Sequence, residues 1–431
     1  MCLLKLSDDR AQHARFGRFL KNPRVSVAEI VERVGERTAG LARGRHVLAI
    51  QDTSEINYQA KAGRKQGLGT VGNGTDIGLF VHPVLVVDAK DGGCLGLAHA
   101  QIWRRKKPKA ANYRQLPIEK KESHRWLVGG DGAKQALAGA DVVTNVSDRE
   151  GDIFELMDRH PDERNHLLTR ASQDRALRGG GRLFTKLDNW PEVARYSVDL
   201  PARVGKRSAR KAVLAVRFGT VHIRRPKSCS DPAAPASLHM TAIDVREVDP
   251  PHDEESVHWR LLTTHTVANE QEARQVVDWY RMRWNIEQLF RTLKRQGVDV
   301  ESSLIEDGSA LERLAMLSLI AATRTMQLVL ARDPIAGRAP IERVFDKDEV
   351  AFIEALQARL QGRTEKQKNP HPQGSLGYAS WTIARLGGWN GYASGRPPGP
   401  ITMHNGLQRF DAMLQGWALA NASMKQDVCR R

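Results

Sequence analysis

The sequence predicts a mixed α/β fold in which a β-rich stretch interrupts a core of strands and helices, and a helical region follows. Three observations predict this class. Apolar runs of strand length alternate with helical segments in the first 163 residues. Short alternating runs separated by turn residues then occupy residues 164–266. Beyond them, apolar residues recur mostly at helical spacing.

Composition limits the function classes. The 431 residues are enough for two or three domains, and 66 Lys and Arg against 50 Asp and Glu give a formal charge of +16. Such an excess favours a polyanionic partner, with nucleic acid as the first candidate. The four cysteines form no CxxC pair and the histidines no HExxH motif, which argues against a zinc site. We find no signal peptide and no apolar run near the ~20 residues that span a bilayer, and expect no membrane partner.

The elements follow in order from the N-terminus. Residues 1–45 are predicted to be helical, with Ser26 capping the second helix. The runs at 46–52, 79–89 and 94–105 predict three consecutive antiparallel strands. A basic loop at 104–114 and a helix precede the next strand, at 140–148, and "EGDIFELMDRH" predicts another helix.

The segment "GLGTVG" is a misleading motif. Gly67, Gly69 and Gly72 match GxGxxG, but a dinucleotide site needs these glycines to open a helix, whose N-terminus binds the pyrophosphate. Here more turn residues and a strand follow. The pattern therefore favours a flexible loop over a nucleotide site.

Two acids end predicted strands. Asp52 ends "HVLAIQD" and Asp148 ends "VVTNVSD", so both are expected at an edge of the sheet, although turn-forming acids at strand ends are also common. Within "SDREGD", Asp152 is a rival for Asp148 and Glu150 a weaker one. The strand-end position favours Asp148.

A third acid lies in "DWYRMRWNIEQLFRTLKRQG" (278–297), which predicts a single amphipathic helix. At about 100° per residue, four polar residues fall within about 60° of one another, away from the apolar stripe: Tyr280, Arg283, Glu287 and Lys294. Tyr280 and Trp284 place aromatic rings near these bases, as in surfaces that bind nucleic acid. A solvated helix with charge pairs is the alternative.

Three carboxylates in a basic protein predict a metal site. Mg²⁺ prefers oxygen ligands, and two such ions support phosphodiester chemistry. Asp52, Asp148 and Glu287 are therefore the candidate ligands and catalytic residues, with Mn²⁺ as a substitute for Mg²⁺.

The residues around Glu287 are similar in type and spacing to those of a known family. The spacing Y-x2-R-x3-E-x6-K at Tyr280, Arg283, Glu287 and Lys294 resembles the signature of the IS4-type, Tn5-like DDE transposases. "IQDTSEINY" and "SDREGDIFELM" are similar to the two aspartate blocks of that family, and "IARLGGWNGYASGRPPGPITMHNGLQRF" to its C-terminal block.

The resemblance implies an RNase H-like core, a β-rich insertion, and Mg²⁺-dependent cleavage at transposon ends through a DNA hairpin, followed by strand transfer into target DNA. Tyr280, Arg283 and Lys294 match family residues that contact terminal phosphates. Trp259 is where the family has a tryptophan that stacks on a flipped base, with a core tryptophan as the alternative. Arg170 would contact phosphate, and Trp284 is a further candidate for DNA binding. The implied partners are double-stranded DNA and a second subunit in the DNA complex, in the bacterial cytoplasm at the nucleoid.

The resemblance also assigns the domains. We expect a partial N-terminal helical DNA-binding region at 1–45, core segments at 46–163 and 267–307 around the insertion at 164–266, and a dimerisation and DNA-contact region at 308–431. The family usually has a longer N-terminal region, so weaker end recognition is expected. The open alternatives are an N-terminally truncated transposase that binds DNA or dimerises without cutting, and a general metal-dependent nuclease.

Overall fold

The computed structural model describes residues 7, 9–72, 74–105, 113–200, 202, 205, 207–392 and 395–428, with side chains in the last helix as far as residue 420. The chain forms two compact units. Unit 1 comprises Met1–Arg43, Thr53–Pro108 and Asn285–Arg431, and unit 2 comprises Gly44–Asp52 and Lys109–Trp284. Each unit is described separately.

Unit 2 is built on a mixed sheet with the strand order β1-β6-β7-β11-β10-β9-β8. Strand β1 (His46–Gln51) pairs in parallel with β6 (Val142–Ser147), and β6 pairs in parallel with β7 (Asn165–Arg170). The remaining pairs are antiparallel. These strands are β8 (Ala194–Leu200), β9 (Arg210–Arg224), β10 (Ser237–Glu247) and β11 (His258–Thr263). The β-rich stretch thus continues the sheet that carries β1 and β6.

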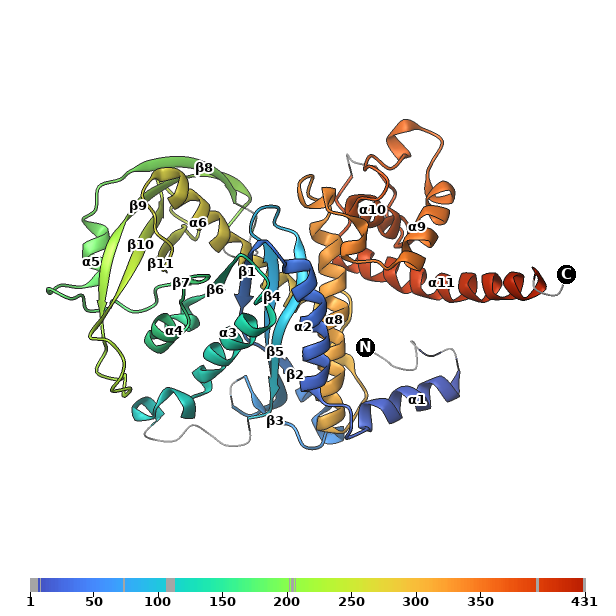
Figure 1. Ribbon diagram of the computed structural model, residues 1–431, viewed down its shortest axis with the longest axis horizontal. Coiled ribbons are helices and arrows are strands. Elements are labelled where there is room, and N and C mark those ends of the chain that lie inside the picture. Colours follow the sequence, from blue (N-terminus) through green and yellow to red (C-terminus); the bar gives the residue numbers. More distant parts are fainter. Residues whose placement is uncertain are drawn as a thin grey trace. The chain divides into compact units, whose positions relative to one another are not determined.

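Helices cover both faces of this sheet. On one face, α3 (Arg125–Ala136), α4 (Phe154–Arg159) and α5 (Leu183–Asp188) contribute to a core with Leu167, Met240 and Leu262 from the strands. On the other face lies α6 (Glu270–Met282), whose Tyr280 packs against Trp259 of β11 (Figure 1). Because side chains alternate along a strand, the residues on either side of Trp259 point away from α6.

Unit 1 contains a smaller antiparallel set of strands. The long β4 (Asp76–Asp88) pairs with β5 (Cys94–Trp103), as predicted. It also pairs with two short strands that the sequence analysis missed, β2 (Ser54–Asn57) and β3 (Gly69–Val71). The loop expected at "GLGTVG" is therefore wrong in part, because Gly69 to Val71 form β3, and a turn rather than a helix follows. Most of the predicted basic loop lies outside the described residues.

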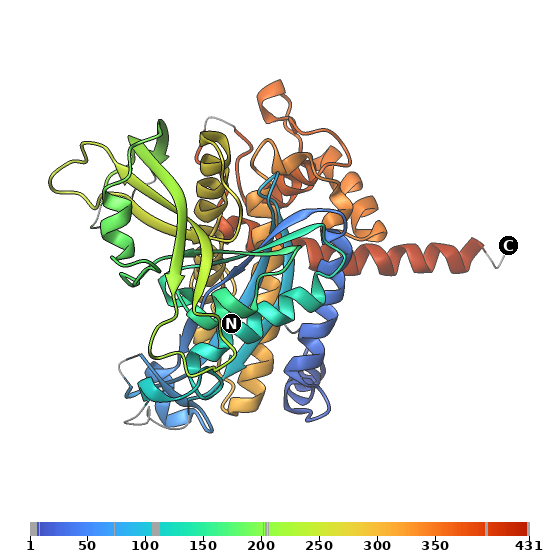
Figure 2. The same cartoon turned by 60° about the vertical axis from the view of Figure 1, so that its left-hand side comes forward.

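The helices of unit 1 lie at both ends of the chain. At the start are α1 (Arg10–Lys21) and α2 (Val27–Ala42), and the Ser26 hydroxyl caps α2 by accepting a hydrogen bond from Glu29 N–H at 3.0 Å, as predicted. The later helices are α7 (Trp284–Lys294), α8 (Gly308–Leu330), α9 (Lys347–Leu360), α10 (Leu376–Leu386) and α11 (Pro400–Val428). Helix α11 extends well past α9 and α10 (Figure 2).

The expectation that the sequence holds no apolar run near membrane-spanning length is corrected by helix α8. Among the described residues, this helix is long and apolar enough to cross a bilayer, but 67% of its most apolar window is buried inside the protein. It packs beside α2 against β5. The mixed sheet and the helical C-terminal region confirm the mixed α/β class and are compatible with an RNase H-like core.

Candidate active site

Asp52 and Asp148 follow two adjacent parallel strands of unit 2. The register of β1 and β6 runs from His46 opposite Val142 to Ile50 opposite Val146. Two residues further along, the same register brings Asp52 opposite Asp148. Neighbouring strands lie about 4.8 Å apart. The backbone positions of Asp52 and Asp148 therefore follow the ends of neighbouring strands at the carboxyl edge of the sheet.

Asp148 is held in place by its own backbone. Its φ of −84° and ψ of −159° are extended, and the next residues turn into a short 3₁₀ helix. The carboxylate accepts a hydrogen bond from Glu150 N–H at 2.8 Å through Oδ1. The hydroxyl of Thr169 donates to the Asp148 carbonyl at 3.1 Å and ties the strand end to β7.

The rival acids have other partners. The Asp152 side chain is fully buried, and its Oδ1 accepts a hydrogen bond from Arg175 Nε at 2.8 Å. Its Oδ2 accepts from Ser172 N, Ser172 Oγ and Gln173 N at 2.7, 3.0 and 3.0 Å. Glu150 pairs with Arg125 at 2.6 Å. Asp152 is thus a saturated structural carboxylate, and this geometry favours Asp148 at the site.

Arg283 and Tyr280 lie beside the two aspartates within unit 2. Arg283 Nη1 is 3.6 Å from Asp52 Oδ2, with both side chains less than one-fifth exposed. The Arg283 guanidinium carbon is 5.9 Å from the centre of the Tyr280 ring. Burial raises the pKa of Tyr280, and the nearby Asp148 carboxylate raises it further, whereas Arg283 and Arg170 act in the opposite direction. The phenol is therefore a neutral hydrogen-bonding group next to the aspartates.

Trp259 and Arg170 complete this cluster. The Trp259 ring meets the Tyr280 ring edge-on, with centroids 5.7 Å apart and planes at 62°. Arg170, at the end of β7, donates a hydrogen bond through Nη2 to the carbonyl of His258 at 2.7 Å, and its charge acts on the nearby Tyr280 phenol. Burial lowers the pKa of the Arg170 guanidinium. Trp259 is half-buried and contacts Tyr280, the residue beside Arg283 and Asp148.

The predicted single helix over 278–297 is wrong. Helix α6 ends at Met282 and α7 begins at Trp284. At the break, Arg283 N–H bonds to the carbonyl of Tyr280, three residues back, at 3.1 Å, so the chain is locally wound more tightly than an α-helix. Inside α7, Glu287 and Lys294 lie two turns apart on one side of the helix, and both are half-buried.

Lys294 lies among acids of unit 1. Its Nζ is 4.0 Å from Glu301 Oε1, and Glu55 contributes further attraction. Burial lowers the pKa of Lys294, and the two acids offset part of that effect. Glu301 also accepts a hydrogen bond from Asn57 N–H at 3.0 Å. The sequence analysis missed Glu301 and Glu55, because their proximity to Lys294 depends on tertiary packing. Trp284, the first residue of α7, is half-buried.

The donor chemistry of the aspartate pair suits a hard divalent cation. Two adjacent carboxylates at a strand edge supply oxygen ligands, and Asp148 keeps Oδ2 clear of the capping hydrogen bond. In the described part of the chain, three or more His, Cys, Asp or Glu residues do not come together in a cluster that could hold a metal ion.

A comparison of the sequence with protein-family models identifies the family of this chain. The model of the transposase DDE domain matches residues 100–324, about half of the chain. This chain belongs to the transposase DDE domain family. The matched range includes Asp148 and Glu287, and Asp52 precedes it. As a member of this family the transposase is an enzyme of the polynucleotidyl transferase type that acts on DNA, and its family uses divalent metal ions. The prediction of a DDE transposase is confirmed at this level.

Proposed function

We propose that this transposase is of the IS4 type, cuts phosphodiester bonds at the ends of a transposon, and joins the resulting 3′-hydroxyl to target DNA. The observation that carries the proposal is the parallel pairing of β1 with β6, the two strands that Asp52 and Asp148 follow. The motif Y-x2-R-x3-E-x6-K, at Tyr280, Arg283 and the residues that follow, supports the same assignment.

In the proposed mechanism, Asp52, Asp148 and Glu287 are the catalytic carboxylates and would hold two Mg²⁺ ions, for which Mn²⁺ could substitute. When bound, the ions activate the nucleophilic oxygen and stabilise the leaving one. Asp148 enters this set with its carboxylate oriented by Glu150 N–H. Arg283 lies beside Asp52. Its positive charge would offset the negative charge of the phosphate that the carboxylates help to cut.

The neighbouring side chains bind the DNA end. Arg283, Arg170 and Lys294 supply positive charge to terminal phosphates, and the neutral Tyr280 phenol donates a hydrogen bond. Trp259 stacks on a base flipped out during hairpin formation, which is sequence-tolerant because every base has an aromatic face. Trp284 offers a second ring near these bases. The buried pairing of Arg170 with the His258 carbonyl keeps this guanidinium in a fixed position before DNA arrives.

The same proposal extends to architecture and partners. Residues 164–266 are an insertion in an RNase H-like core, residues 308–431 contribute to a dimer that assembles on DNA, and residues 10–42 contact DNA. The enzyme works at the bacterial nucleoid. The formal charge of +16 supports a polyanionic partner.

The test uses a plasmid that carries the DNA flanking the transposase gene on both sides of a marker. With Mg²⁺, the wild-type protein is expected to release the marker fragment with hairpin ends. Glu287→Gln is expected to abolish cutting while binding persists, because the amide keeps the shape of the side chain and loses its charge. Gel electrophoresis measures cutting, and fluorescence anisotropy of labelled end DNA measures binding.

Two outcomes would contradict the proposal. Binding of the wild-type protein to end DNA without any cutting would favour a non-catalytic, DNA-binding and dimerising transposase. Cutting that ignores the flanking sequence would favour a general metal-dependent nuclease. A matched control is Glu150→Gln, since Glu150 lies on the same loop as Asp148 but pairs with Arg125. This variant is expected to cut normally.

A further inference from the structure

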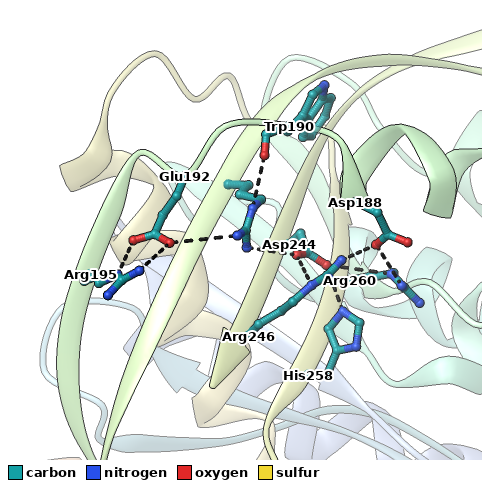
Figure 3. Close-up of polar contacts among 9 residues, drawn as sticks. Asp188, Trp190, Glu192, Arg195, Asp244, Arg246, His258 and Arg260 are labelled. Atoms are coloured by element: carbon teal, nitrogen blue, oxygen red, sulfur yellow. Dashed lines mark hydrogen bonds and ion pairs between the residues drawn. The ribbon is translucent and has the colours of Figure 1, made fainter. Parts of the chain in front are cut away.

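Asp244, on β10, is a fully buried carboxylate surrounded by positive charge. It lies on the face of the unit 2 sheet that α5 covers (Figure 3). Its two oxygens meet four groups from three strands: Arg246 Nε at 2.7 Å, His258 Nε2 at 2.9 Å, and Arg217 Nη1 and Arg260 Nε, both at 3.7 Å. Asp188 and Glu192 pair with these arginines from the periphery.

Two of the four groups belong to the residues on either side of Trp259. The register pairs Asp244 with Arg260, Arg246 with His258, and Val245 with Trp259. Side chains alternate between the two faces, so Trp259 points toward α6 while His258 and Arg260 point back toward Asp244. One carboxylate therefore holds both neighbours of the tryptophan from behind the sheet.

The front of the sheet has its own restraints on the same residue. Arg170 donates to the carbonyl of His258 at 2.7 Å, and the Tyr280 ring packs edge-on against Trp259. These contacts limit how far the indole can move on the α6 side. The network on the opposite face adds a separate restraint, on the side chains of His258 and Arg260.

We infer that Asp244 is a positioning residue for Trp259, acting through His258 and Arg260. Without its negative charge, Arg217, Arg246 and Arg260 would repel one another across β9, β10 and β11. The two residues that flank the indole would then lose their common anchor. The inference rests on the proposed role of Trp259 as the residue that stacks on an extruded base. It adds a residue on the neighbouring strand, on the opposite face of the sheet.

The first test needs no DNA, so it stands apart from the proposed function. The full-length protein is labelled with 5-fluorotryptophan, and the Trp259 signal among the nine tryptophans is assigned in the ¹⁹F NMR spectrum with Trp259→Phe. Asp244→Asn and His258→Ala are each expected to shift or broaden that signal selectively. Glu192→Gln is the matched control, because it removes a charge that pairs with Arg217 in the same network without touching His258 or Arg260. An unchanged Trp259 signal in both test variants would overturn the inference.

The second test asks whether the effect reaches DNA. The probe is end DNA with 2-aminopurine at the terminal positions, whose fluorescence rises when the base leaves the stack. Asp244→Asn is expected to lower the extrusion equilibrium roughly five- to one-hundredfold, the range for losing one base–aromatic stack. In a Trp259→Ala background it is expected to add almost nothing. Full additivity would overturn the inference. A wild-type protein that never extrudes the base would instead contradict the proposed function, while the ¹⁹F result would still stand.

Discussion

The two aspartates of "SDREGD" are predicted to give opposite phenotypes when each is changed to asparagine. Asp152 is buried with Arg175, whose side chain is 5% exposed. In the wild-type protein, Ser172 and Gln173 donate to one Asp152 oxygen and Arg175 donates to the other. In Asp152→Asn, the NH₂ group would therefore face a hydrogen-bond donor in either orientation of the amide. Disrupting a buried charge pair costs about 3–5 kcal/mol. Asp152→Asn is therefore expected to lower the free energy of unfolding by that amount.

Asp148→Asn should behave differently. Its Oδ1 caps the turn by accepting Glu150 N–H, and an asparagine oxygen caps about as well as an aspartate. The free energy of unfolding is expected to change by less than about 0.5 kcal/mol, the usual limit for a substitution away from core features. Cutting of end DNA is expected to disappear, because a ligand charge is lost.

The assay is urea denaturation followed by far-UV circular dichroism and tryptophan fluorescence, paired with the plasmid assay at a temperature where both variants are folded. Asp152→Asn should unfold at lower urea and, while folded, still cut. Equal stabilities, or loss of cutting in folded Asp152→Asn with cutting retained in Asp148→Asn, would refute the assignment.

Three further predictions concern pH and DNA contacts. Burial lowers the pKa of His265 to about 3, so its contribution to stability is present above pH 6.5 and is lost as the pH falls toward 3. From pH 7 to pH 5 the loss is about 2 kcal/mol, and His265→Gln should flatten this part of the pH–stability profile measured by urea denaturation. Lys294→Ala should weaken DNA binding and reduce the slope of log affinity against log salt by about one, measured by anisotropy. Tyr280→Phe, which keeps the ring packed on Trp259, should reduce cutting more than it reduces stability, as measured in the plasmid and urea assays.

Much of the fold follows from local patterns. The strands at 46–52, 79–89, 94–105 and 140–148 were predictable because each is a continuous apolar run, and their burial in the structure agrees. The short strands β2 and β3 were not, because only three or four residues of mixed character pair with the edge of β4. Such strands depend on a partner that a linear pattern does not reveal.

The candidate site was also predictable in part, because the ends of apolar strands can be recognised from local patterns. Strand ends identify Asp52 and Asp148 as candidates, but only the parallel register shows that the two are neighbours. Asp152 could not be ranked with certainty from the sequence, since its partner Arg175 lies 23 residues away and gives no periodic signal. The Asp244 network was missed entirely, because its charges come from three strands and from the segment around α5.

The break between α6 and α7 at Arg283 limits which residues of the motif can be compared by helical spacing. Over one turn, the prediction that Tyr280 and Arg283 share a side survives, because a 3₁₀-type hydrogen bond places residues i and i+3 almost in line. Over two turns inside α7, Glu287 and Lys294 also share a side, since seven residues return to within about 20° in an α-helix. Between the two pairs, Arg283 lies outside both helices and contacts Asp52 and Tyr280 of its own unit.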